Sequence, residues 1–361
     1  MRERHRDRLA RLRAQMSEAE LDALVVSAPS NIFYLSGFRG SAGALLIGVD
    51  RAALVSDFRY RLQAAEQAPG FEFVDIERHL LAGVGQTARA AEIQRLGYDP
   101  AHLTCELRDE LAGGAGGVEL VSAPGLVEEL RAVKSREEVE QIRSAAVLAD
   151  RAVTHMVSVA RAGAVERDIA IEGEFAMRRE GAEAAAFDII VSSGPRSALP
   201  HAETTERKLQ AGDLVVIDVG ARAAGYCSDM TRTFAVEMAS PEAQEIYKLV
   251  YRAQRAAVAA VRGGAVCGEV DAIARSMIEE AGHGEAFGHG LGHGVGIEVH
   301  EAPRLHRGEA TELVAGNVVT VEPGVYLEGL GGVRLEDLLV VGENGADTLT
   351  GFPMADELPI V

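Results

Sequence analysis

Four carboxylates stand at positions where the surrounding sequence is apolar. Asp218 lies inside the run LVVIDV, and Asp229 begins a second β-rich run eleven residues later. Glu322 follows VVTV, and Glu336 interrupts GVRLEDLLVV. A buried ionised carboxylate is costly unless it pairs with a cation or binds a metal. The four positions are therefore candidate metal ligands, whereas the simpler interpretation is that Asp229 caps a turn and Asp218 pairs with Arg232.

A glycine-rich segment adds three histidines to these carboxylates. FGHGLGHGVGIEVHEAP contains His289, His293 and His300, with five glycines at alternate positions. The glycines exclude a helix and predict close approach of this backbone to other segments. Imidazole is the commonest metal ligand near neutral pH, so this clustering indicates a site. The segment does not match H-E-x-x-H, and a dinucleotide-binding loop would need a preceding strand and a following helix.

Two Asp, two Glu and one His form an oxygen-rich donor set with one nitrogen. Such sets suit pairs of Mn²⁺, Co²⁺ or Zn²⁺ ions bridged by carboxylates. A two-metal site stabilises both an attacking hydroxide and a developing oxyanion, which is typical of hydrolysis. Other catalytic schemes fit less well, because the sequence has no G-x-S-x-G elbow, no Walker loop and only three scattered cysteines.

The first half of the sequence predicts an α/β domain. Strands are expected at 21–27, 44–49, 52–56, 71–76 and 93–98, with a turn at 29–31 and a helix at 60–67. The basic N-terminal segment, residues 1–16, is expected to form a surface helix with its leucines turned inward. A glycine-rich segment at 111–125 is interpreted as a soft domain boundary, which gives domains of 1–125 and 126–361.

The second half predicts an α+β domain that holds the candidate site. Ser135 and Glu138 form a capping box that starts a long helix, and further helices are expected at 166–180, 241–261 and 270–281. The strands are expected at 214–219, 231–236, 318–322 and 334–341.

Composition limits the classes of partner. The 361 residues carry a net charge of −19, and most of the acidic excess lies in the second half. This charge argues against nucleic-acid binding and against docking on anionic lipid. There is no apolar run long enough to span a bilayer and no signal-peptide pattern, so a cytoplasmic protein is expected.

Taken in order, the motifs resemble those of the pita-bread metallopeptidases, family M24. The motifs are D-x-G and D-x-T-R-T around Asp218 and Asp229, G-H-G-V-G at His293, V-E-P-G at Glu322 and V-R-L-E-D at Glu336. The segment NIFYLSGFRGSAGALLIG resembles the N-terminal domain of the proline-specific branch, M24B. The resemblance implies a C-terminal pita-bread domain preceded by a smaller creatinase-like α/β domain, assembled as a homodimer.

The resemblance also assigns a role to each ligand. Asp218 would bind one divalent ion through both oxygens, and Asp229 and Glu336 would bridge two ions, with Mn²⁺ preferred and Zn²⁺ or Co²⁺ as alternatives. His293 and Glu322 would complete the coordination, and Glu322 would also accept a proton.

Four further residues match positions that surround the substrate in this family. His300 would stabilise the intermediate or help to protonate the leaving nitrogen, and His201 and His289 would line the substrate pocket. Arg334 would orient the metal-binding carboxylates. The simpler interpretation of all four is polar scaffolding.

The resemblance leaves the substrate open between two classes of Xaa-Pro peptide. Asp57, Arg59 and Tyr60 match the D-x-R-Y motif of small bacterial aminopeptidases P, which favours an Xaa-Pro aminopeptidase. A helix N-cap is the simpler interpretation of Asp57. The alternative is an Xaa-Pro dipeptidase (prolidase), in which Arg39 is a candidate for reading the substrate carboxylate. A non-catalytic peptide- or protein-binding module is a third possibility.

Overall fold

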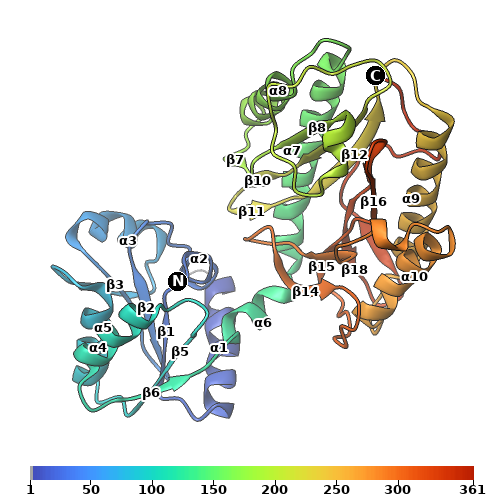
Figure 1. Cartoon of the computed structure of the whole chain (residues 1–361). Helices are drawn as coiled ribbons and strands as arrows, with labels where there is room; N and C mark the ends of the chain where they lie inside the picture. The colour runs from blue at the N-terminus through green and yellow to red at the C-terminus, as the bar shows by residue number, and fades with distance from the viewer. Residues whose placement is uncertain (1–2) are drawn as a thin grey trace. The chain divides into compact units, whose positions relative to one another are not determined.

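The computed structural model describes residues 3–361, and the chain divides into two compact units, Met1–Arg131 and Ala132–Val361 (Figure 1). Over these residues, the first unit has one sheet and the second has four, and neither unit shares its hydrophobic clusters with the other. Among the helices of residues 3–361, none combines the length and the apolarity needed to cross a bilayer.

The first unit is built on a six-stranded mixed sheet with the order β4-β3-β2-β1-β5-β6. Its strands are β1 (Ala23–Val26), β2 (Ala44–Gly48), β3 (Ala52–Ser56), β4 (Glu72–Asp75), β5 (Arg95–Tyr98) and β6 (Glu119–Ser122). Its helices are α1 (Glu3–Glu18), α2 (Pro29–Ser36), α3 (Arg61–Gln67), α4 (Leu80–Ala90), α5 (Cys105–Ala115) and α6 (Leu126–Ala132). Helices α4 and α5 cover one face, and α1 and α2 lie on the other (Figure 1). Leu9 and Leu12 of α1 are buried, which confirms the predicted amphipathic helix.

Two predictions about the first unit are wrong. The predicted turn at 29–31 is the start of α2, because Pro29 suits the first helical turn and Gly37, with φ of 81°, ends the helix. The predicted soft segment at 111–125 contains the end of α5 and all of β6. A Cβ on Gly114 would lie 2.1 Å from the Ala82 carbonyl oxygen, so glycine is needed there for α5 to pack against α4.

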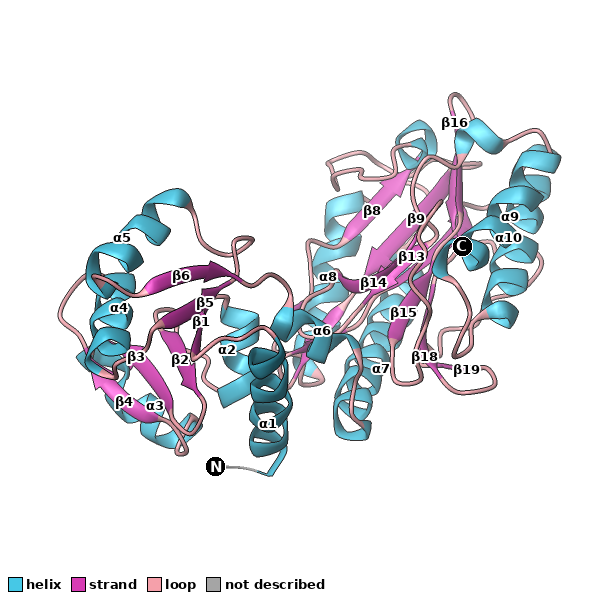
Figure 2. Cartoon of the chain, turned by 90° about the horizontal axis from the view of Figure 1, so that it is seen from below, coloured by secondary structure: helices cyan, strands magenta, loops and turns pink. Residues whose placement is uncertain are grey.

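The second unit contains two helix pairs, each packed on a sheet (Figure 2). Its helices are α7 (Arg136–Val159), α8 (Glu166–Arg179), α9 (Pro241–Ala260) and α10 (Cys267–Glu280). Ser135 caps α7, and Glu138 returns the hydrogen bond, which confirms the predicted capping box. Helices α7 and α8 share one core with the sheet β12-β9-β8, and α9 and α10 share another with the C-terminal strands.

The strands of the second unit belong to four small sheets. The first sheets contain β7 (Ala184–Ala185), β8 (Ile190–Ser193), β9 (Leu214–Val219), β10 (Ala221–Ala223), β11 (Tyr226–Cys227) and β12 (Met230–Ala235). The C-terminal sheets contain β13 (Gly292–Gly294), β14 (Glu301–Leu305), β15 (Val318–Val321), β16 (Gly324–Leu327), β17 (Gly331–Arg334), β18 (Asp337–Val341) and β19 (Ala346–Thr348). The predicted α+β class is confirmed.

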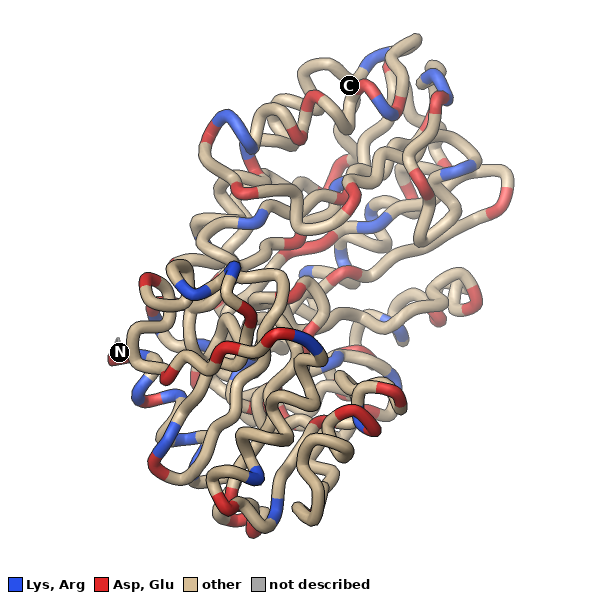
Figure 3. The backbone as a smooth tube through the Cα atoms, turned by 90° about the vertical axis from the view of Figure 1, so that its left-hand side faces the viewer, with Lys and Arg blue, Asp and Glu red and all other residues tan. Residues whose placement is uncertain are grey.

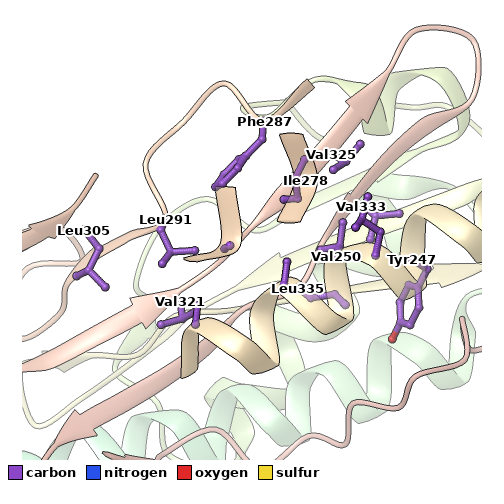
Figure 4. Close-up of a cluster of buried hydrophobic side chains, with 14 of the residues drawn as sticks. Tyr247, Val250, Ile278, Phe287, Leu291, Leu305, Val321, Val325, Val333 and Leu335 are labelled. Carbon is purple, nitrogen blue, oxygen red and sulfur yellow. The ribbon is translucent and has the colours of Figure 1, made fainter. Parts of the chain in front are cut away.

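The prediction of a single strand at 334–341 is wrong. Two strands, β17 and β18, occupy this region, and the break between them matters for the site. β17 pairs with β16, whereas β18 pairs with β15, so the chain leaves one sheet and enters another between them. Glu336 stands at this junction. Leu335 and Val321 are fully buried in the core shown in Figure 4, while the next residue in each case is a candidate ligand. The core therefore fixes Glu336 and Glu322 through their immediate neighbours.

Candidate metal centre and active-site cavity

Asp218 and Asp229 lie at one end of the β9–β12 pair, on either side of the connection that contains β10 and β11. Asp218 belongs to β9 and lies opposite Thr231 of β12, while Asp229 directly precedes β12. Arg232 is the next residue after Thr231, so its side chain points to the other face of the pair. There its Nη2 donates to Asp337 Oδ1 at 2.8 Å. The simpler interpretation, in which Arg232 pairs with Asp218, is wrong.

The predicted ligands from three other segments converge on Asp229. Potential ligand atoms of Asp229, His293 and Glu336 all lie within 4.8 Å of one another. His293 Nε2 lies 3.7 Å from Asp229 Oδ2 and 3.2 Å from Glu322 Oε1. His293 stands in β13, Glu322 follows β15 and Glu336 separates β17 from β18. The tertiary structure thus gathers residues that are far apart in the sequence.

Glycines allow β13 to carry His293 between two other strands. A Cβ on Gly292 would lie 2.1 Å from the Thr320 carbonyl oxygen, and one on Gly294 would lie 2.3 Å from the Ala302 carbonyl oxygen. Real Cβ atoms do not approach backbone this closely, so both positions require glycine. The predicted close approach of the glycine-rich segment is confirmed.

A single cavity of about 540 Å³ is lined by all five predicted ligands. The polar residues that share this cavity are Asp188, His201, His289, His300, Arg304, His306, Tyr326 and Arg334. Apolar walls come from Phe187, Ile190, Pro200 and Val299. The cavity therefore combines a cluster of buried carboxylates with titratable and cationic groups and with surfaces that suit an apolar ring.

Arg334 connects the carboxylates from outside the cluster. Its Nη2 donates to Asp218 Oδ2 at 2.6 Å, its Nε to the Thr231 hydroxyl at 3.1 Å and its Nη1 to the Tyr326 hydroxyl oxygen at 3.0 Å. The Thr231 hydroxyl in turn donates to Glu336 Oε2 at 2.7 Å. One guanidinium thus fixes, directly or through one hydroxyl, two of the four carboxylates.

The histidines occupy distinct places around the cluster. The His300 ring lies 4.3 Å, centre to centre, from the His293 ring, and His289 Nε2 lies 3.0 Å from the Tyr326 hydroxyl. Burial lowers the pKa of His289, and burial together with the charge of His293 lowers the pKa of His300. Both imidazoles are therefore neutral at pH 7. His201 is exposed and lines the cavity.

Two protein families match this chain. The sequence profile of the metallopeptidase family M24 matches residues 140–343, and that of the creatinase/prolidase N-terminal domain matches residues 8–133. The chain belongs to metallopeptidase family M24. The predicted resemblance and the predicted two-part fold are both confirmed.

Solved and curated relatives of this M24 peptidase cover nearly all of its length. An Xaa-Pro dipeptidase from Bacillus anthracis is 40% identical, with a TM-score of 0.95 over 99% of this chain and 100% of the other. The Xaa-Pro dipeptidase of Pyrococcus furiosus is 36% identical over 96% of this chain and 98% of its own. An X-Pro aminopeptidase from Thermotoga maritima is 35% identical, with a TM-score of 0.90 over 98% and 99% of the two chains.

The electrostatics of the cluster test whether divalent metal ions fit this M24 site. Burial raises the pKa of Asp229 well above its usual range, and the charges of Glu336 and Asp218 raise it further. Burial and the charge of Glu322 do the same to the pKa of Glu336. Among residues 3–361, no protein group hydrogen-bonds the buried Oδ1 of Asp218. Crowded carboxylates with an unused oxygen are the environment that divalent cations stabilise, so the residues fit a dinuclear site.

Burial, rather than acidity as such, marks this site. Acidic positions occur along the helices and loops of both units of the M24 peptidase (Figure 3). Asp229 and Glu336, by contrast, are only 5% and 2% exposed. The net charge of the chain would not have located them.

Asp57, Arg59 and Tyr60 lie in the first unit, away from the residues above in sequence. Asp57 caps the short 3₁₀ helix Phe58–Tyr60, and its carboxylate accepts from the backbone and side chain of Arg59 at 3.0 and 2.8 Å. The Tyr60 hydroxyl lies 2.6 Å from that of Ser41. These contacts match the simpler N-cap interpretation, and a role of the D-x-R-Y motif in substrate binding stays a prediction.

The sequence interpretation missed three residues of the cavity network. Thr231 and Tyr326 were overlooked although each stands beside or within a recognised motif, D-x-T-R-T and V-E-P-G-V-Y. Arg304 stands where the H-E-x-x-H motif would require a second histidine after His300. It lines the cavity, and its charge, after burial and the charge of His293, contributes to the lowered pKa of His300. Its position four residues after His300 was the available signal.

Proposed function

We propose that this M24 metallopeptidase is an Xaa-Pro dipeptidase that hydrolyses the amide bond between any first residue and a C-terminal proline. The observation that carries the proposal is that Arg304 lines the same cavity as the carboxylate cluster. A dipeptide has a carboxylate directly behind the proline, and a cation in the cavity can pair with it. An aminopeptidase must instead leave this end of the cavity open for the continuing chain.

The similarity to two proteins named Xaa-Pro dipeptidase supports this choice over the aminopeptidase that the D-x-R-Y motif favours. The Xaa-Pro aminopeptidase is kept as the second candidate because of that motif and because of the similarity to the X-Pro aminopeptidase of Thermotoga maritima. Mn²⁺ as the native metal, a homodimer and a cytoplasmic location stay predictions.

We propose the five predicted residues that line this cavity as the metal ligands. Asp218, Asp229, His293, Glu322 and Glu336 would hold two divalent ions. Such ions polarise the scissile carbonyl and activate water at neutral pH.

The protein's own residues then handle the substrate and the protons. Burial is the largest influence on the pKa of Glu322 and raises it, but the hydrogen bond from His293 and the charges of His293, His289 and Arg334 together leave the pKa below its usual value. Glu322 is therefore ionised at neutral pH and can accept a proton at Oε1 or Oε2. Hydrolysis requires a proton on the proline nitrogen, which has no N–H of its own in the substrate. The neutral imidazole of His300 can donate a hydrogen bond to the carbonyl oxygen or support protonation of this nitrogen.

Product analysis tests the proposal. Protein loaded with Mn²⁺ is incubated with Ala-Pro and with Ala-Pro-Ala, and released alanine is measured. We expect cleavage of the dipeptide at a rate at least tenfold above that of the tripeptide. Faster cleavage of the tripeptide would replace the dipeptidase by the aminopeptidase. If neither peptide is cleaved and less than one metal ion binds per chain, the non-catalytic binding module is the correct interpretation.

A further inference from the structure

A buried ion pair on α10 lies beside the cavity without touching the proposed metal ligands. Asp271 and Arg275 are one helical turn apart, with Nε–Oδ2 and Nη2–Oδ1 distances of 2.7 Å each. Their side chains are 1% and 10% exposed. A bidentate pair with this little exposure fixes the guanidinium plane, so its remaining N–H groups point in defined directions.

Those N–H groups bind the backbone of the segment that leads to β13. Arg275 Nη1 donates to the Phe287 carbonyl at 2.9 Å, and Nη2 donates to the His289 carbonyl at 2.8 Å. The Leu291 amide donates to Asp271 Oδ1 at 3.1 Å. Residues 287–291 belong to no helix or strand. Backbone groups of this segment therefore form hydrogen bonds with the Asp271–Arg275 pair instead of with a neighbouring strand.

A second set of contacts runs from Arg275 to the imidazole of His289. The guanidinium lies 4.2 Å from the centre of the Phe287 ring, and the Phe287 ring meets the His289 ring edge-on at 5.1 Å. Phe287 and Leu291 are buried in the same core as Ile278 of α10 (Figure 4). Both the backbone and the ring of His289 are thus placed by groups that Arg275 contacts.

We propose that Asp271 and Arg275 form a positioning pair for His289, which holds the imidazole at the cavity wall in the orientation that meets Tyr326. The kinetic consequence of this inference rests on the proposed function, because His289 then contacts a proline-containing substrate. A purely structural pair would stabilise α10 without affecting His289 selectively. Lysine cannot replace Arg275, because one ammonium cannot make the bidentate pair and both carbonyl contacts in the same plane.

Chemical modification tests the inference without requiring activity. The rate at which diethyl pyrocarbonate modifies each histidine is measured by peptide mass spectrometry in the wild type and in Arg275→Lys. We expect His289 to react at least threefold faster in Arg275→Lys, while His79, an exposed histidine of the first unit, reacts at an unchanged rate. Equal rates at His289 in both proteins would overturn the inference.

Matched variants control for charge and for folding. Arg307→Lys makes the same exchange at an exposed arginine that pairs with Glu279, and it should leave the His289 rate unchanged. Asp271→Asn keeps the size of the side chain but removes its charge and one of the two acceptor oxygens for Arg275. It should therefore also accelerate modification of His289. If Asp271→Asn leaves the His289 rate at the wild-type value, the pair does not position this residue.

A double-mutant cycle supplies the kinetic readout. We expect Arg275→Lys to lower kcat/KM for Ala-Pro at least tenfold in the wild-type background but less than twofold in His289→Ala. Equal losses in the two backgrounds would mean that Arg275 does not act through His289. If the wild type loaded with Mn²⁺ cleaves no Xaa-Pro peptide, the proposed function fails, and the modification rates still decide the inference.

Discussion

Arg334 holds one oxygen of Asp218, and none of residues 3–361 hydrogen-bonds the other oxygen. The two side chains come from β17 and β9, are 5% and 14% exposed, and meet with an Nη2–Oδ2 distance of 2.6 Å. Oδ1 is buried, and no group of residues 3–361 hydrogen-bonds it. A carboxylate held in this way has a fixed orientation and a free lone pair, which is the arrangement expected of a pre-organised metal ligand.

Replacing Arg334 by lysine should weaken both metal binding and catalysis. Lysine retains the charge but cannot donate to Asp218, Thr231 and Tyr326 in one plane. We expect affinity for Mn²⁺ and kcat/KM to fall by about 10- to 100-fold. Isothermal titration and steady-state kinetics measure the two effects, and an unchanged affinity for Mn²⁺ would show that the guanidinium does not orient the ligands.

Gly292→Ala should displace β13 from β15. The added methyl group would lie 2.1 Å from the Thr320 carbonyl oxygen, so the two strands must separate. Overpacking of this kind costs about 1–3 kcal/mol of unfolding free energy. We expect that loss in urea denaturation together with loss of metal binding, because His293 is the next residue. Gly288→Ala is the matched control, since a Cβ there meets no atom within 4 Å, and equal destabilisation by both changes would contradict the prediction.

Arg304→Met should change the substrate preference more than the overall activity. Losing a charge-assisted hydrogen bond costs about 1.5–3 kcal/mol, which corresponds to about a tenfold to hundredfold decrease for a substrate that uses it. We expect this decrease in kcat/KM for Ala-Pro and a smaller one for Ala-Pro amide, which has no carboxylate. Parallel decreases for both substrates would show that Arg304 does not read the carboxylate.

Removing the metal should make stability decrease as the pH rises. In the metal-free fold, burial and mutual repulsion raise the pKa values of Asp229 and Glu336 above the ordinary values of about 4. Above about pH 4 the folded state then binds more protons than the unfolded state. The unfolding free energy therefore falls as the pH rises through the raised pKa values.

Thermal melts of metal-free and Mn²⁺-loaded protein between pH 5 and 8 measure this effect. We expect the Tm difference between the two forms to widen with increasing pH, because bound cations remove the repulsion and the ligands bind metal only when deprotonated. A difference that is constant across this range would contradict the proposed ligand set.

Sequence patterns were sufficient for the family and for most secondary structure of the second unit. These elements depend on residues that are close together in the sequence. They are the capping box at Ser135, helices α7 to α10, and the apolar strands around Asp218 and Glu322. The wrong predictions concern segments whose structure depends on distant residues. The packing of the folded unit decides whether 29–31 forms a turn or begins α2. It also decides whether 111–125 is a loose linker or a packed segment.

The sequence by itself determined which residue types are present at the candidate centre: four carboxylates and an imidazole beside apolar strands, where unpaired charge is expensive. Only the tertiary structure decided which cation each acidic group meets. Successive side chains of β12 point to opposite faces, so Arg232 pairs with Asp337 and not with Asp218. Because the chain changes sheets between β17 and β18, Arg334 pairs with Asp218. Both arginines stand in recognised motifs, but the motifs do not specify these partners. Pairing partners follow from strand register and side-chain direction, and neither is encoded by any one segment alone.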